Sequence, residues 1–145
     1  RQQETENSDG MDVVLIRLEY LDNGEIELVY AGAKRPLYII TETGLTEFKP
    51  NRKSIGGMNW IERVYTNHKV KLKSGAMLYL FSDGIGDTVS PERKRLGTTK
   101  VKELIQQYSI TSLVKQKQLL EQAIITFKKG SGQRDDVTLI GLKLK

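Results

Sequence analysis

The segment AMLYLFSDGIGD, residues 76–87, decides the fold of this 145-residue chain. Its first six residues form a nearly continuous apolar run, which is typical of a strand that is covered on both faces. Two carboxylates, Asp83 and Asp87, follow this run among glycines. The segment therefore predicts a central buried strand with acidic side chains at its carboxyl end.

Apolar and polar residues alternate on both sides of this segment, which indicates further strands. We expect strands at residues 11–20, 26–33, 37–41, 45–48, 63–72, 76–81 and 137–144. Helical spacing of apolar residues predicts helices at residues 99–108 and 111–128. Strands followed by helices indicate an α+β fold with helices packed on a sheet, and the last strand must return to that sheet.

The composition excludes several kinds of site. The chain has no cysteine, so it has no disulfide, no thiolate nucleophile and no zinc site built on sulfur. Its single histidine, His68, lies within an alternating strand, where a structural role is expected. A bound metal would be held by oxygen atoms, which favour Mg²⁺, Mn²⁺ or Ca²⁺.

Charge and hydropathy limit the partners of the chain. No apolar run approaches the roughly 20 residues that a membrane-spanning helix needs, so we expect no membrane segment in this chain. Lys and Arg number 23 and Asp and Glu 18, which gives a net charge of +5. Because few aromatic residues are interleaved with the basic ones, we expect no nucleic-acid binding.

A second acidic pair, Asp135 and Asp136, precedes the last apolar strand and also follows glycines. Glycines allow carbonyl groups and ions to approach the backbone closely. Carboxylates at the ends of two buried strands, without histidine, are the kind of ligand that hard cations prefer. Taken alone, each acidic pair is also compatible with a plain turn or a capping loop.

Several motifs of the chain, met in this order, resemble those of the PPM-type protein serine/threonine phosphatases. The resemblance is closest to their bacterial branch, the stage II sporulation protein E and RsbU-like phosphatases. The matching motifs are GMDVVL at 10–15, VYAGAKRPL at 29–37, LYLFSDGI at 78–85, LG at 96–97 before a helix, and RDDVTLI at 134–140.

This resemblance implies an α-β-β-α sandwich of antiparallel sheets with flanking helices, and a binuclear Mn²⁺ or Mg²⁺ centre in the complete domain. A water molecule activated by metal would attack the phosphorus of phosphoserine or phosphothreonine, so no covalent nucleophile is expected. By position, Asp83 and Asp135 would ligate metal. Asp87 would help to hold a third, weaker metal, and Asp136 would support the ligands from outside the coordination sphere.

One motif of the family is missing from the chain. The first metal-binding Asp, within a D-x-(S)-G-H-G segment, would lie before residue 10, and Asp9-Gly10 lacks that context. We therefore expect residues 10–145 to be the C-terminal part of a single phosphatase domain whose N-terminal part is missing. Residues 1–9 would be a disordered or linker segment, and this fragment alone would be inactive.

Lys34 and Arg35 lie at the 29–37 hairpin, where the branch often has a His or Asn pair. Their cationic groups could help to receive a phosphate. The alternative is an ordinary exposed hairpin tip.

The implied function is a metal-dependent serine/threonine phosphatase in bacterial signalling. It would act on a phosphorylated regulatory protein, such as an anti-sigma-factor antagonist, from a cytoplasmic domain of a membrane-bound or sensor-linked parent protein. The alternative is a catalytically silent protein-interaction module on the same fold. Open strand edges could also pair with a second copy, which would form a homodimer.

Overall fold

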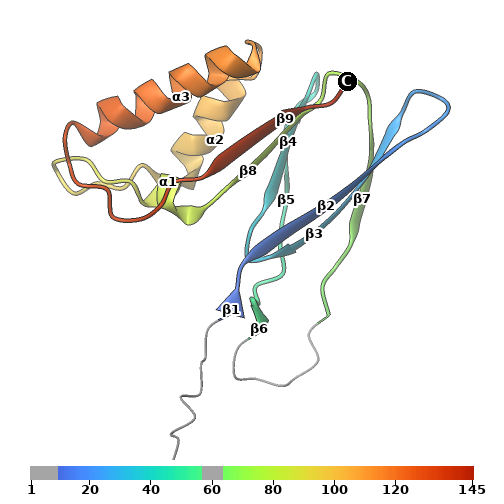
Figure 1. Ribbon diagram of the computed structural model, residues 1–145, viewed down its shortest axis with the longest axis horizontal. Coiled ribbons are helices and arrows are strands. Elements are labelled where there is room, and N and C mark those ends of the chain that lie inside the picture. Colours follow the sequence, from blue (N-terminus) through green and yellow to red (C-terminus); the bar gives the residue numbers. More distant parts are fainter. Residues whose placement is uncertain (1–9, 57–63) are drawn as a thin grey trace, which may run out of the picture. The chain divides into compact units, whose positions relative to one another are not determined.

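The computed structural model describes residues 10–56 and 64–145 of the chain. It divides into one unit of residues 1–37 and 47–73 and another of residues 38–46 and 74–145. The elements labelled in Figure 1 are β1 (Gly10–Met11), β2 (Val13–Tyr20), β3 (Ile26–Ala33), β4 (Leu37–Thr41), β5 (Gly44–Phe48), β6 (Ile55–Gly56), β7 (His68–Leu72), β8 (Met77–Phe81), α1 (Asp83–Asp87), α2 (Gly97–Tyr108), α3 (Leu113–Lys128) and β9 (Leu139–Lys143).

The first unit is built on a three-stranded antiparallel sheet with the order β2-β3-β7. β2 and β3 form a hairpin that pairs along its whole length, from Val13 opposite Ala33 to Tyr20 opposite Ile26. Gly24 in the connecting turn has a φ of 78°, a backbone conformation that glycine adopts readily. The predicted strands on both sides of this turn are confirmed, although the first begins two residues later than expected.

The strand predicted at residues 63–72 is wrong over its first half. Residue 63 lies outside the described residues, and β7 begins only at His68. The backbone N–H of Thr66 donates to the side-chain oxygen of Asn51 at 2.9 Å, so this segment is held by a loop and not by a neighbouring strand. The His68 ring lies 5.7 Å from the ring of Tyr30, as expected for a structural histidine.

The second unit contains most of a four-stranded sheet with the order β5-β4-β8-β9. β8 lies in its interior, as its apolar sequence predicts, and pairs antiparallel with both β4 and β9. The last strand therefore returns to the sheet after the helices, which confirms that prediction. In Figure 1, α2 and α3 lie over one face of β8 and β9.

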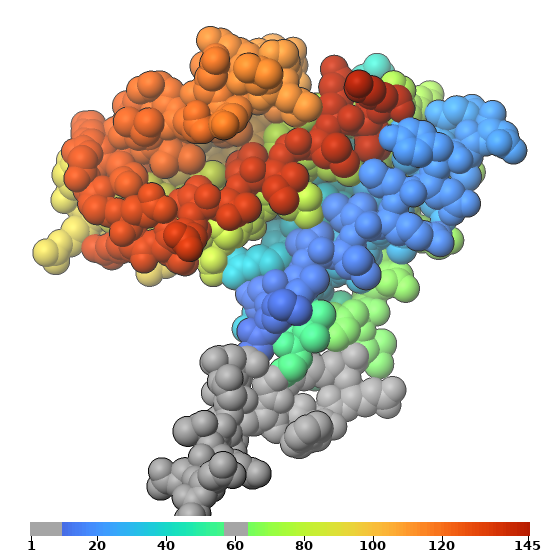
Figure 2. Space-filling view, viewed as in Figure 1, coloured from blue at the N-terminus to red at the C-terminus, as the bar shows by residue number. Residues whose placement is uncertain are grey.

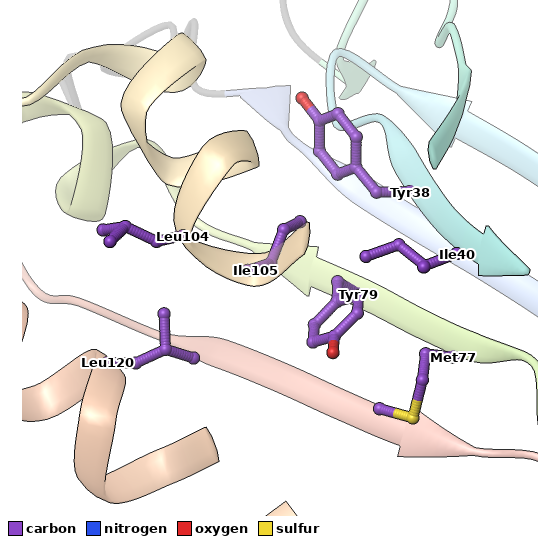
Figure 3. Close-up of a cluster of buried hydrophobic side chains, with 7 residues drawn as sticks. All are labelled: Tyr38, Ile40, Met77, Tyr79, Leu104, Ile105 and Leu120. Carbon is purple, nitrogen blue, oxygen red and sulfur yellow. The ribbon is translucent and has the colours of Figure 1, made fainter. Parts of the chain in front are cut away.

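The core of this unit lies between the sheet and the two long helices. Side chains from β4, β8, α2 and α3 point toward one another there, as Figure 3 shows. Its buried members are Tyr38, Ile40, Met77, Tyr79, Leu104, Ile105 and Leu120. Both predicted helices are confirmed within two residues, because their apolar positions recur with the period that buries one face of a helix.

A buried polar network joins α3 to β8. Gln116 is only 3% exposed, and its side-chain oxygen accepts a hydrogen bond from the Tyr79 hydroxyl at 2.7 Å. Its side-chain nitrogen donates to the backbone carbonyls of Thr111 at 2.8 Å and of Ser109 at 3.3 Å. Burial raises the pKa of Tyr79 to about 12, so the hydroxyl keeps its proton at neutral pH.

Among the described residues, the helices lack the combination of length and hydropathy that crossing a membrane requires.

We expect Gln116→Ala to lower the free energy of unfolding by about 2 kcal/mol, because it leaves buried polar groups without partners. Gln118→Ala is the matched control, since Gln118 is exposed on the same helix and should change the value by less than about 0.5 kcal/mol. Urea denaturation followed by circular dichroism measures both. Equal effects of the two substitutions would contradict a structural role for the network.

Candidate metal centre

The acidic residues after β8 lie on a short helix that the sequence did not predict. α1 covers Asp83–Asp87 and contains two glycines, which are poor helix formers. Tertiary contacts stabilise it instead: Ile85 is 1% exposed, and the Thr88 hydroxyl donates to the backbone carbonyl of Gly84 at 3.1 Å. Asp83 lies in the first turn, where a negative charge is favourable to the helix.

Ser82 connects the end of β8 to the segment that precedes β9. Its backbone N–H donates to the carbonyl of Thr138 at 3.0 Å. Its hydroxyl accepts from the N–H of Thr138 at 3.0 Å and donates to the carbonyl of Asp136 at 3.1 Å. Sequence reasoning missed this role of Ser82, although a hydroxyl residue directly before Asp-Gly was the available signal.

Gly84 allows the backbone of Asp136 to lie directly against α1. A Cβ atom on Gly84 would lie 2.2 Å from the carbonyl oxygen of Asp136 and 3.6 Å from the carbonyl carbon of Asp135. No side chain fits at such distances, so glycine is required at this position. The structure thus brings the backbones of Asp83 and Asp135 into one neighbourhood, although they are far apart in the sequence.

The four predicted metal residues differ in their surroundings. Asp83, Asp135 and Asp136 are exposed. The Asp135 carboxylate accepts from the N–H of Asp136 at 2.8 Å, which fixes its direction. The Asp87 carboxylate accepts from the guanidinium of Arg95 at 2.8 Å, so a cation at Asp87 would compete with an arginine.

The donor chemistry of the site suits a hard divalent cation. Asp83 and Asp135 offer exposed carboxylate oxygens, the ligands that Mn²⁺ and Mg²⁺ prefer. Within residues 10–56 and 64–145, however, no three Asp, Glu or His side chains lie close enough together to hold a metal ion. The two aspartates therefore fit as part of a ligand set that needs further oxygens, and their role as ligands stays a prediction.

Lys34 and Arg35 lie beside an acidic residue in the first unit. The Arg35 guanidinium donates to Asp12 at 2.8 Å, and the Lys34 ammonium lies 4.0 Å from the same carboxylate. The Ser54 hydroxyl also donates to Asp12, at 2.7 Å. Asp12 thus offsets much of this positive charge, and phosphate binding at the pair stays a prediction.

Two predictions fall on residues that the structure does not describe. They are the disordered or linker character of residues 1–9 and the first residue, 63, of the strand predicted at 63–72.

The chain is similar to proteins of known families. A family model described as Stage II sporulation protein E (SpoIIE) matches residues 2–145. Protein IcfG of Synechocystis sp. is 25% identical over 123 residues, which make up 84% of this chain and 19% of that protein. The chain thus spans a small part of this relative.

Solved structures share the fold. The SiaA-PP2C domain of Pseudomonas aeruginosa matches with a TM-score of 0.72 and 25% identity, over 82% of this chain and 47% of that one. The phosphatase domain of SpoIIE from Bacillus subtilis matches with a TM-score of 0.61 and 16% identity, over 92% of this chain and 56% of that one. RsbX in complex with magnesium matches with a TM-score of 0.59 and 13% identity, over 97% of this chain and 59% of that one. These matches confirm the predicted class, antiparallel sheets with helices as in PPM-type phosphatases.

We expect Gly84→Ala to lower the free energy of unfolding by about 1–3 kcal/mol, because the new methyl group overlaps the Asp136 backbone. Gly86→Ala is the matched control in the same helix, since a Cβ there lies 3.6 Å from its nearest neighbour. It should leave the stability unchanged or raise it slightly, because alanine favours helix. Chemical denaturation of both variants tests this, and a Gly84→Ala chain as stable as the control would disprove the close approach.

Proposed function

Because the chain belongs to the stage II sporulation protein E family, we propose that residues 10–145 are the C-terminal part of a metal-dependent protein serine/threonine phosphatase domain. The observation that carries this proposal is the contact between Gly84 and Asp136, which joins the two acidic motifs. The length of the match supports it as well, since the chain spans 56% of the SpoIIE phosphatase domain.

In this proposal Asp83 and Asp135 hold a divalent cation through their carboxylates. When bound, the cation would neutralise charge on phosphoryl oxygens and lower the pKa of a water molecule. Ser82 and Gly84 position the two ligands, because they fix the end of β8 against the segment before β9. Arg95 orients the carboxylate of Asp87 at the other end of α1.

The metal in this proposal is Mn²⁺ or Mg²⁺, in a binuclear centre in the complete domain. Two solved relatives support this choice, a SpoIIE phosphatase domain described as presoaked with Mn and RsbX in complex with magnesium. The proposed substrate is a phosphorylated regulatory protein of the anti-sigma-factor-antagonist type. The description of the Bacillus subtilis relative as a cell fate determinant supports a signalling role for this family.

One observation favours the second candidate, a catalytically silent interaction module. The part of the chain that the structure describes contains no cluster of three acidic or histidine side chains able to hold a metal. An isolated pair of carboxylates binds divalent cations weakly, because hard cations take six or more oxygen ligands.

We expect Asp83→Asn and Asp135→Asn each to weaken Mn²⁺ binding by about tenfold or more, since each removes a charged ligand. Isothermal titration of this chain with Mn²⁺ measures the affinities. Asp22→Asn is the control, because Asp22 is an exposed carboxylate in the β2–β3 turn. Wild-type affinity in both ligand variants would rule out the proposed centre, and tight binding by the unaltered chain would contradict an incomplete ligand set.

We also expect the full-length parent protein to hydrolyse a phosphoserine peptide in the presence of Mn²⁺ and to lose this activity in EDTA. Asp135→Asn in the parent should reduce the rate by about a hundredfold, because a ligand of the catalytic metal is lost. Release of inorganic phosphate measures the rate. Activity that persists in the variant, or none in the unaltered parent, would favour the silent module.

A further inference from the structure

Two adjoining cavities lie along α3 in the second unit. The first, of about 410 Å³, lies between the end of α3, α1 and the segment before β9, and Asp87 and Asp135 line it. The second, of about 380 Å³, lies between α3 and the strands β8 and β9. Ile124 and Val137 line both cavities, so one groove runs along α3 and ends at Asp135. We call this the α3 groove, and its characteristic residues are Leu113, Ile124, Ile125, Lys128, Arg134 and Val137.

The walls of the α3 groove are largely apolar. Ile125 is 63% exposed and Leu113 is 42% exposed, which are high values for such side chains. The two volumes fall within the range of about 300–1,000 Å³ that is usual for ligand sites. In Figure 2 the end of α3 and the segment after it, in orange and red, form a continuous exposed surface of this unit.

The end of the α3 groove next to Asp135 is cationic. Lys128 and Arg134 line it, and neither makes an ion pair with any described residue. Two acidic side chains line the same end: Asp87 is paired with Arg95 at 2.8 Å, and Asp135 is the proposed metal ligand. With a divalent cation on Asp135, as the proposed function requires, a ligand with a negative charge near this end would meet the cations of Lys128 and Arg134.

We propose that the α3 groove binds the polypeptide segment that carries the phosphorylated residue. Apolar side chains of that segment pack on Ile125 and Leu113, an acidic side chain contacts Lys128 and Arg134, and the phosphorylated residue reaches Asp135. The sixteen residues of α3 extend over about 24 Å, the span of about seven extended residues. This inference rests on the proposed function and adds the chemistry of the substrate to it.

Charge favours this occupant over a second copy of the chain. A second copy carries a net charge of +5 and presents the same cationic groove end, so like charges would meet. An acidic phosphorylated segment has the complementary charge.

The test measures binding of a fluorescein-labelled peptide to this chain by fluorescence anisotropy, with Mn²⁺ present. The probe is an eleven-residue peptide with a central phosphoserine flanked by leucines and glutamates, and its partner probe has lysines in place of the glutamates. We expect the acidic probe to bind at least about tenfold more tightly than the basic one. Lys128→Glu, Arg134→Glu and Ile125→Asp should each weaken binding of the acidic probe by about fivefold to tenfold.

Lys115→Glu is the matched control, because Lys115 is exposed on α3 and lies outside the groove. It makes the same charge change and should leave binding unchanged. All four variants should keep the thermal unfolding temperature of the unaltered chain, since the altered side chains are not in the core. Equal binding of the two probes, or equal loss in Lys115→Glu, would overturn the proposal. So would a dimer in sedimentation velocity that the groove variants dissociate.

A second arm separates this inference from the proposed function. The unphosphorylated acidic peptide, without Mn²⁺, should still bind weakly and lose that binding in Lys128→Glu. Lys128→Glu should still bind Mn²⁺, because Lys128 is not a ligand of the proposed centre. If Asp135→Asn leaves Mn²⁺ binding unchanged, the proposed metal centre is wrong, and the groove proposal is then judged on the peptide data alone. If Lys128→Glu and Arg134→Glu leave peptide binding unchanged, the groove proposal is wrong, and the conclusion on metal binding is not affected.

Discussion

The backbone of Asp136 occupies the space that a side chain on residue 84 would need, and the candidate centre depends on this contact. Only glycine at position 84 permits it, because any Cβ would overlap the Asp136 carbonyl. Ser82 holds the same two segments through three hydrogen bonds to Thr138 and Asp136. The backbone after β8 packs directly against the backbone before β9. This packing keeps Asp83 and Asp135 close together, whether or not a metal is bound.

Antiparallel pairing explains why two motifs so distant in sequence come together. β9 pairs with β8 so that Leu139, at its start, lies opposite Phe81, at the end of β8. The residues just after β8 must then lie beside the residues just before β9. The same geometry gives the α3 groove its end at Asp135, because α3 covers these two strands and leads directly into the segment that carries the aspartate.

Periodicity and turn residues predicted most of the fold. The strands at 26–33 and 37–41 have the predicted bounds, because strong turn residues flank alternating or apolar runs. The sequence did not predict α1, because glycines are poor helix formers and the contacts that stabilise this helix come from other parts of the fold. The prediction of a strand before His68 was wrong. The backbone N–H of Thr66 donates to the side chain of Asn51, whereas the alternating pattern alone would pair it with a neighbouring strand. The acidic motifs could be found from sequence, whereas the role of Ser82 follows only from its hydrogen bonds, and that of Lys128 and Arg134 only from their place in the groove.

The most direct test of the account is a titration of the ¹⁵N-labelled chain with substoichiometric Mn²⁺, monitored by the loss of amide signals in NMR spectra. A paramagnetic ion held jointly by Asp83 and Asp135 should weaken the signals of residues 82–84 and 134–136 most strongly, and at the same Mn²⁺ concentrations. Signal loss centred on only one of these segments, or elsewhere in the chain, would contradict a shared centre.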